Sequence, residues 1–194
     1  VRTMTVSVAG GNSREVTLTQ FAAGSGGDTK GIYTSMSQFI PASTSTTDRY
    51  YPSNSTIDGQ PATGFKLGTS SLAGVFTSEA LGASLTGDKK LSFYAVAWTG
   101  KAATVYIRVN NGGAVSGDGS HAITASAGAA GSGNDFTFTD VTDSDYYTFQ
   151  LTGLTAASTV TISTSPDFTA ASDRNTGRAI VLGVQVLSLI HISE

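Results

Sequence analysis

The sequence contains no cysteine, only two histidines and one tryptophan, and only 13% of its 194 residues carry a charged side chain. The absence of cysteine excludes disulfides, thiolate metal sites and a cysteine nucleophile. No apolar run approaches the roughly 20 residues that cross a bilayer, so we expect no membrane insertion. The formal net charge is −3, and the sequence has no basic stretch that would bind a phosphate backbone. We therefore expect no nucleic-acid partner.

The chain is instead rich in glycine, with 23 residues, and its hydrophobic fraction of 39% is enough for a folded core. Apolar and polar residues alternate with period two through most of the chain, without a convincing 3.6-residue stripe. Strands are expected at Thr3–Val8, Glu15–Phe21, Phe65–Leu67, Ala73–Phe76, Lys90–Trp98, Ala103–Asn110, His121–Ser126, Asp135–Phe138, Tyr146–Leu151, Thr159–Ser163 and Ala179–Leu187. Between Ala22 and Gly64 we expect long loops around one or two short strands. This pattern predicts an all-β, antiparallel two-sheet β-sandwich.

We expect residues 1–187 to form a single domain, because a hairpin made by the first residues is too small to be stable alone. The sequence begins at Val1 without a methionine or a signal peptide, so we expect a piece of a longer protein with flanking domains as partners. The run SLIHISE, Ser188–Glu194, resembles translated sequencing-adapter read-through, which predicts a non-native tail. The alternative is that Ile190 and Ile192 extend the last strand.

Several segments of the second half resemble a known family at the level of pattern. They are LSFYAVAW at 91–98, VYIRV at 105–109 with the turn NNGG at 110–113, YTFQL at 147–151, TAASTVTI at 155–162 and VLGV at 181–184. Together they are similar to the galactose-binding-like jelly-roll modules of bacterial secreted glycoside hydrolases and surface adhesins, over about residues 64–187. The resemblance implies a jelly roll, a secreted or cell-surface location, and either recognition of a polysaccharide or surface glycan, or mere spacing beside other domains.

A sugar-binding surface needs an aromatic ring for the C–H face of a pyranose, with polar groups beside it. One group of candidates shares a polar, proline-bounded segment with loop-like composition: Asp48, Arg49, Tyr50, Tyr51 and Asn54. We expect one of the two tyrosines to pack against the domain. Trp98, the only tryptophan, either packs in the core or lies at the rim of the sandwich as a further candidate.

The densest acidic run is DVTDSD, which contains Asp140, Asp143 and Asp145. Calcium prefers six to eight oxygen ligands and tolerates loop geometry, but the EF-hand pattern is absent. We therefore expect a solvated turn and no cofactor, with a calcium site as the alternative.

No residue set in the sequence predicts catalysis. Apart from the tail, His121 is the only histidine, and the run GDGSH that contains it lacks the order of a nucleophile elbow. Nothing brings Glu15 or Glu79 to an aspartate, as a glycosidase pair requires. We therefore predict that the chain is not an enzyme but a non-catalytic carbohydrate-binding or accessory module of a larger secreted or surface protein. The alternative is a structural or display module of an adhesin, surface-layer or phage-type fibre protein.

Overall fold

The computed structural model describes residues 2–7, 13–18, 33–57, 60–98, 102–123, 137–138, 141, 143–170 and 177–188. Regular structure in these segments is β-strand, apart from short 3-10 helices at η2 (Ser37–Phe39), η3 (Ala83–Leu85) and η4 (Asp143–Asp145). No helix among the described residues is long and apolar enough to cross a membrane.

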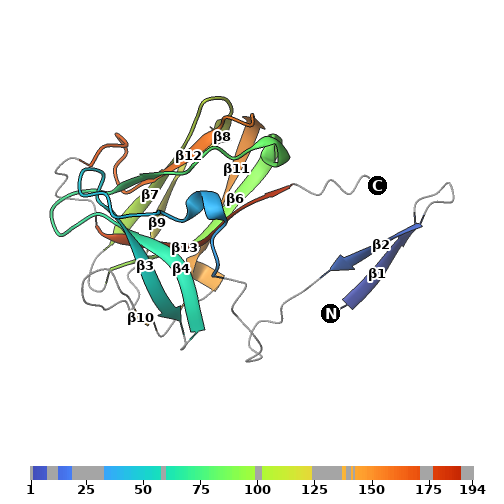
Figure 1. Ribbon diagram of the computed structural model, residues 1–194, viewed down its shortest axis with the longest axis horizontal. Helices are drawn as coiled ribbons and strands as arrows, with labels where there is room; N and C mark the ends of the chain where they lie inside the picture. Colours follow the sequence, from blue (N-terminus) through green and yellow to red (C-terminus); the bar gives the residue numbers. More distant parts are fainter. Residues whose placement is uncertain are drawn as a thin grey trace.

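From β3 onward the described strands form two sheets that face each other (Figure 1). The larger sheet has the order β10-β3-β4-β13-β6-β11-β8, with β3 at Tyr50–Ile57, β4 at Gln60–Leu67, β6 at Gly87–Ala97, β8 at Ala114–Ser116, β10 at Thr137–Phe138, β11 at Tyr146–Leu154 and β13 at Ala179–Ser188. The smaller sheet has the order β5-β12-β7-β9, with β5 at Val75–Thr77, β7 at Ala103–Asn110, β9 at Ser120–Ile123 and β12 at Thr159–Ser163. Neighbouring strands are antiparallel except β10 and β3, so the predicted antiparallel two-sheet β-sandwich is confirmed.

The connections between the sheets are those of a jelly roll. In chain order β4, β5, β6 and β7 alternate between the two sheets, and β9 then pairs beside β7. The later strands alternate back: β11 lies beside β6, β12 between β5 and β7, and β13 between β4 and β6. Such returning connections across two sheets define the double-sheet jelly roll.

The core lies between the sheets, where the inward-facing residues of both meet. Phe93 of β6 and Phe149 of β11 stack there, with their ring centres 5.7 Å apart. On β13 the alternation changes phase at a bulge, where the register with β6 shifts after Leu182 and Gly183 adopts a φ of 63°. Glycine adopts such a φ without strain. Val181 before the bulge and Val184 after it therefore both face the core.

Between Ala22 and Gly64 we predicted long loops around one or two short strands; residues 33–49 contain no strand, whereas β3 and the start of β4 form longer, fully paired strands than expected. They pair along eight positions, and β4 also pairs with β13. Pro52 is tolerated in β3 because, among the described residues, the outer edge of β3 is paired at Tyr50, Thr56 and Ile57 but not at the proline, as edge strands allow.

The first described residues form a two-stranded sheet of their own, in which β1 (Arg2–Ser7) pairs with β2 (Ser13–Leu18). The assignment of residues 1–187 to one domain stays a prediction. Ser188 ends β13, and the rest of the predicted non-native tail lies outside the described residues.

Candidate functional site

The outer face of the larger sheet carries a second apolar cluster, separate from the core. Strand alternation places Ile180 and Leu182 of β13 and Val96 of β6 on this face, where they are buried. Tyr94 and Trp98 pack against the same cluster and remain partly exposed. Tyr33 and Ala62 complete this small second core, so its apolar side chains are covered and only the partly exposed rings of Tyr94 and Trp98 are available at its margin for a ligand.

Cross-strand register aligns side chains from four strands across this face. Tyr51 of β3 is opposite Lys66 of β4, Lys66 is opposite Ile180 of β13, and Ile180 is opposite Val96 of β6. Trp98 lies two residues beyond Val96, on the same side of the sheet, since successive side chains of a strand alternate. Residues far apart in the chain are therefore neighbours here.

Two cations contact two aromatic rings at this position. The Nζ of Lys66 lies 4.5 Å from the centre of the Tyr51 ring and 5.7 Å from that of Trp98. The guanidinium carbon of Arg178, just before β13, lies 4.6 Å from the centre of the Trp98 ring. We call Tyr51, Lys66, Trp98 and Arg178 the cation–aromatic cluster. Each such contact contributes about 0.5–1 kcal/mol when exposed and about 2 kcal/mol when desolvated.

Burial and a neighbouring cation both affect the ionisation of Lys66. Lys66 is only 9% exposed, and burial lowers the pKa of its ammonium group below the ordinary 10.5. The positive charge of Arg178 lowers that pKa further, because like charges disfavour each other's ionised form.

Three tyrosines lie beside one another on the same face, and together with the cation–aromatic cluster we call them the platform. Tyr94 is opposite Tyr146 of β11, with ring centres 4.9 Å apart, and Tyr33 meets Tyr94 edge-on at 5.1 Å. Tyr146 is 38% exposed. We call these three residues the tyrosine row. Tyr94 precedes Trp98 by four residues on an extended strand, so about 13 Å separates their backbones.

The predicted tyrosine pair lies in a strand and not in a loop, and its two rings point to opposite faces. Tyr50 packs against the core, with its ring centre 5.3 Å from that of Phe76 in an edge-on geometry. Tyr51 joins the cation–aromatic cluster on the outer face. The expectation that one tyrosine packs against the domain is therefore met by Tyr50.

The other residues predicted beside the tyrosines have local contacts. Asp48 caps its own turn: its Oδ2 accepts a hydrogen bond from the Ser45 hydroxyl at 2.9 Å, and its backbone N–H donates to that hydroxyl oxygen at 3.0 Å. Arg49 has a φ of 60°, and its carbonyl oxygen accepts from the N–H of Gly68 at 2.8 Å. Asn54 belongs to β3, but its side chain lies outside the described residues.

The acidic run is only partly within the described structure. Asp140 and the side chain of Asp143 lie outside it, so the calcium alternative stays a prediction. Asp145 ends η4, and its charge adds to burial in raising the pKa of Tyr147. Among the described residues no group of three or more histidine, aspartate or glutamate side chains could hold a metal ion. The His121 ring packs edge-on against Tyr147, with centres 4.7 Å apart.

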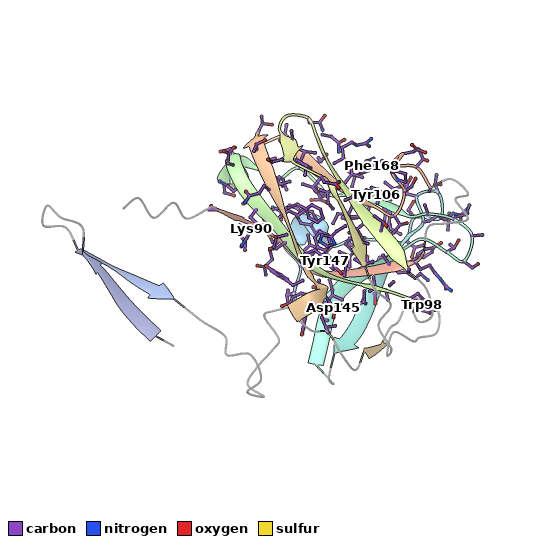
Figure 2. The ribbon with its side chains drawn as sticks, turned by 180° about the vertical axis from the view of Figure 1, so that it is seen from behind. Lys90, Trp98, Tyr106, Asp145, Tyr147 and Phe168 are labelled. Carbon is purple, nitrogen blue, oxygen red and sulfur yellow. The ribbon has the colours of Figure 1, made fainter. Side chains whose placement is uncertain are left out.

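Sequence reasoning identified Tyr51 and Trp98 but missed the residues that the fold brings to them. Within the run FYAVAW, the alternation alone places Tyr94 and Trp98 on one face, and that signal was available. Lys66 and Arg178 gave no such signal, because their neighbours on the outer face belong to other strands. Figure 2 shows Lys90 and Trp98 toward opposite ends of β6, with Trp98 apart from Tyr106 of β7 and from Phe168, which follows β12.

No family model matches the chain, and no curated protein matches it. Among solved structures, the chain is similar to the enzymatically active domain of tailspike protein 4 of bacteriophage CBA120, with a TM-score of 0.37 and 18% sequence identity. The match covers 71% of this chain and 17% of the other. The galactose-binding-like character of the chain stays a prediction.

The prediction that the chain is not an enzyme is corrected here. It depended on the absence of a linear catalytic pattern, whereas catalytic groups are defined by their mutual positions in a fold. The solved domain to which the chain is similar is described as enzymatically active, which contradicts the prediction. A TM-score of 0.37 transfers neither a reaction nor a substrate to this chain.

Proposed function

We propose that the chain binds carbohydrate on the outer face of its larger sheet, through the cation–aromatic cluster and the tyrosine row, as part of a larger secreted or surface protein. The observation that carries this proposal is the position of Trp98: a partly exposed indole on a sheet face, with cations at 4.6 and 5.7 Å from its ring. Sugar rings pack their C–H faces on such rings, and charged groups beside them bind the sugar's polar substituents.

The platform is also suited in form to an extended ligand. Tyr51, Tyr94 and Tyr146 come from β3, β6 and β11 of one sheet, in which β4 and β13 lie between β3 and β6, and Trp98 directly follows β6. Side chains held on strands lose little conformational freedom when a ligand binds. About 13 Å between Tyr94 and Trp98 spans more than one ring contact, which favours a polysaccharide over a single sugar.

A glycan array on the purified chain tests the proposal. We expect Trp98→Ala to weaken binding by about 1–3 kcal/mol, the range for bases that stack on aromatic side chains. The matched control is Phe168→Ala, because the Phe168 ring also packs on a cation, Arg108 at 4.4 Å, but next to the smaller sheet. Equal binding by the two variants would show that the outer face of the larger sheet is not the site.

Two further readouts make the experiment decisive. A folded chain that binds no glycan on the array contradicts the proposal and supports the structural or display alternative. Release of reducing ends from a bound polysaccharide measures whether the chain cleaves what it binds.

A further inference from the structure

The cation–aromatic cluster concentrates positive charge in a chain that is acidic overall. The formal net charge is −3, yet Lys66 and Arg178 both contact the Trp98 ring. Two cations that share one ring repel each other, and the repulsion is relieved when an anion binds between them. The fold therefore brings two basic side chains together at one ring of an acidic chain.

The side chains of Lys66 and Arg178 can donate hydrogen bonds but cannot accept them. Lysine and arginine carry only donors, three and five N–H groups in general, and no acceptor. A neutral sugar presents hydroxyls that both donate and accept, whereas a carboxylate or a sulfate ester presents acceptors alone. Arginine in addition matches the planar, two-oxygen geometry of such anions.

The guanidinium of Arg178 is placed to make such a contact. Among the described residues its side-chain contact is with the Trp98 ring, and no ion pair of this guanidinium is found there. Stacking on the ring leaves the N–H edges of a guanidinium free to donate in its own plane. An anion bound at those edges would lie beside the ring on which a sugar stacks.

We propose that the ligand of this platform is an acidic polysaccharide, whose carboxylate or sulfate groups bind at Lys66 and Arg178 while its sugar rings stack on Trp98 and Tyr51. This inference rests on the proposed carbohydrate function and narrows it to a chemical class. A carboxylate and a sulfate ester both distribute a negative charge over oxygen atoms. The experiment therefore includes one polymer of each kind.

Two matched pairs of polymers separate charge from sugar. Polygalacturonate is compared with its fully methyl-esterified form, and dextran sulfate is compared with dextran, all titrated into the full chain at one low salt concentration. We expect at least one acidic member to bind tenfold or more tightly than its neutral partner. The pair that shows the difference identifies the carboxylate or the sulfate as the group recognised.

Substitutions in the cation–aromatic cluster test whether it causes the preference for acidic polymers. We expect Arg178→Gln to reduce the affinity for the acidic polymer at least fivefold, Arg178→Lys to restore part of it, and Trp98→Ala to weaken binding as well. The matched control is Arg108→Gln, which removes an arginine that also stacks on a ring, that of Phe168, next to the smaller sheet. Because Lys66 is buried, Lys66→Met is interpreted only where its melting transition matches that of the parent chain.

The possible failures are distinct. Equal affinity for the acidic and neutral members, still sensitive to Trp98→Ala, overturns the inference and leaves the proposed carbohydrate function standing. The inference is also overturned if Arg178→Gln does not change the affinity for the acidic polymer. The same holds if double-stranded DNA of equal charge binds with the same affinity. No binding to these four polymers or to any array glycan overturns the proposed function itself.

Discussion

Trp98 and Arg178 contact each other through both backbone and side chain. The N–H of Trp98 donates to the carbonyl oxygen of Arg178 at 2.9 Å, and the guanidinium carbon of Arg178 lies 4.6 Å from the centre of the Trp98 ring. The backbone hydrogen bond fixes the two chain segments side by side, so the indole and its cation are held together before any ligand arrives. Pre-organisation of this kind reduces the entropy lost on binding.

The two adjacent tyrosines of β3 should respond oppositely to substitution. Tyr50→Ala removes a ring from the core beside Phe76 and should lower the free energy of unfolding by about 2–3 kcal/mol, somewhat less than for a fully buried ring. Tyr51→Ala should leave the melting transition nearly in place and weaken glycan binding. Urea unfolding and glycan titration of both variants check this, and the reverse assignment would show that Tyr50 is the ligand residue.

Gly64 of β4 allows close contact with β13 under the platform. A Cβ built at this position lies 2.6 Å from the carbonyl oxygen of Val181 and 3.0 Å from the Cβ of Leu182. Gly64→Ala should therefore push the two strands apart and lower the free energy of unfolding by about 1–3 kcal/mol, as overpacking does. The control Gly117→Ala meets nothing within 4 Å and tests only its left-handed backbone. An unchanged melting temperature for Gly64→Ala would contradict this prediction.

Ser158 ties two turns together at a fully buried position. Its Oγ donates to the carbonyl oxygen of Gly112 at 2.6 Å and accepts from the N–H of Thr155 at 2.8 Å. Ser158→Ala leaves both groups without this partner and should cost about 1–3 kcal/mol of stability. Ser84→Ala, at an exposed position, should stay within about 0.5 kcal/mol of the parent chain. Similar unfolding curves for the two variants would show that the Ser158 contacts add no stability.

Lys66 should make stability depend on alkaline pH. Its pKa is lowered in the folded chain and returns to about 10.5 in the unfolded chain. Between these values the unfolded chain binds more protons, so this contribution to the free energy of unfolding rises with pH and is complete above about 10.5. It is lost as the pH falls through the folded pKa.

The measurement is the difference in unfolding free energy between the parent chain and Lys66→Met, determined by urea unfolding from neutral pH to about 10.5. This difference should shift in favour of the parent chain as the pH rises. Tyr147, whose pKa is raised by burial and by Asp145, acts in the opposite sense in the alkaline range but is common to both proteins. A difference that stays constant with pH would show that Lys66 is not desolvated.

The DVTDSD run gives a prediction about metal. If it held calcium, binding to the folded chain alone would raise the melting temperature by mass action. We expect equal melting curves in calcium and in chelator, as a solvated turn requires. A rise in calcium that Asp143→Asn abolishes would establish the site instead.

The sequence predicted the elements whose local pattern and tertiary environment agree. Strands β7 and β12 match the expected Ala103–Asn110 and Thr159–Ser163, because each alternates cleanly and ends at turn residues. Strand β3 was missed because its proline, serines and asparagine indicate a loop, and its pairing with β4 overrides that local preference. Strand β8, Ala114–Ser116, lies in a glycine-rich segment and depends on pairing with β11.

The site was predictable only as separate residues. Tyr51 and Trp98 were identified by residue type, since aromatic side chains in polar surroundings favour binding. Their common location depends on the insertion of β13 between β4 and β6, which aligns Lys66 with both. Long-range register of this kind is not encoded in local pattern, and the cations were missed for that reason.

The central position of β13 has a consequence for the order of events during synthesis. This strand pairs with both β4 and β6, yet it follows both of them, and β11 and β12, in the chain. Until β13 has been synthesised, β4 and β6 lack the strand that lies between them, and the larger sheet cannot be completed. Pairings this distant in sequence form slowly. Because Arg178 arrives with the same strand, the nascent chain gains its cation–aromatic cluster only when the sandwich closes.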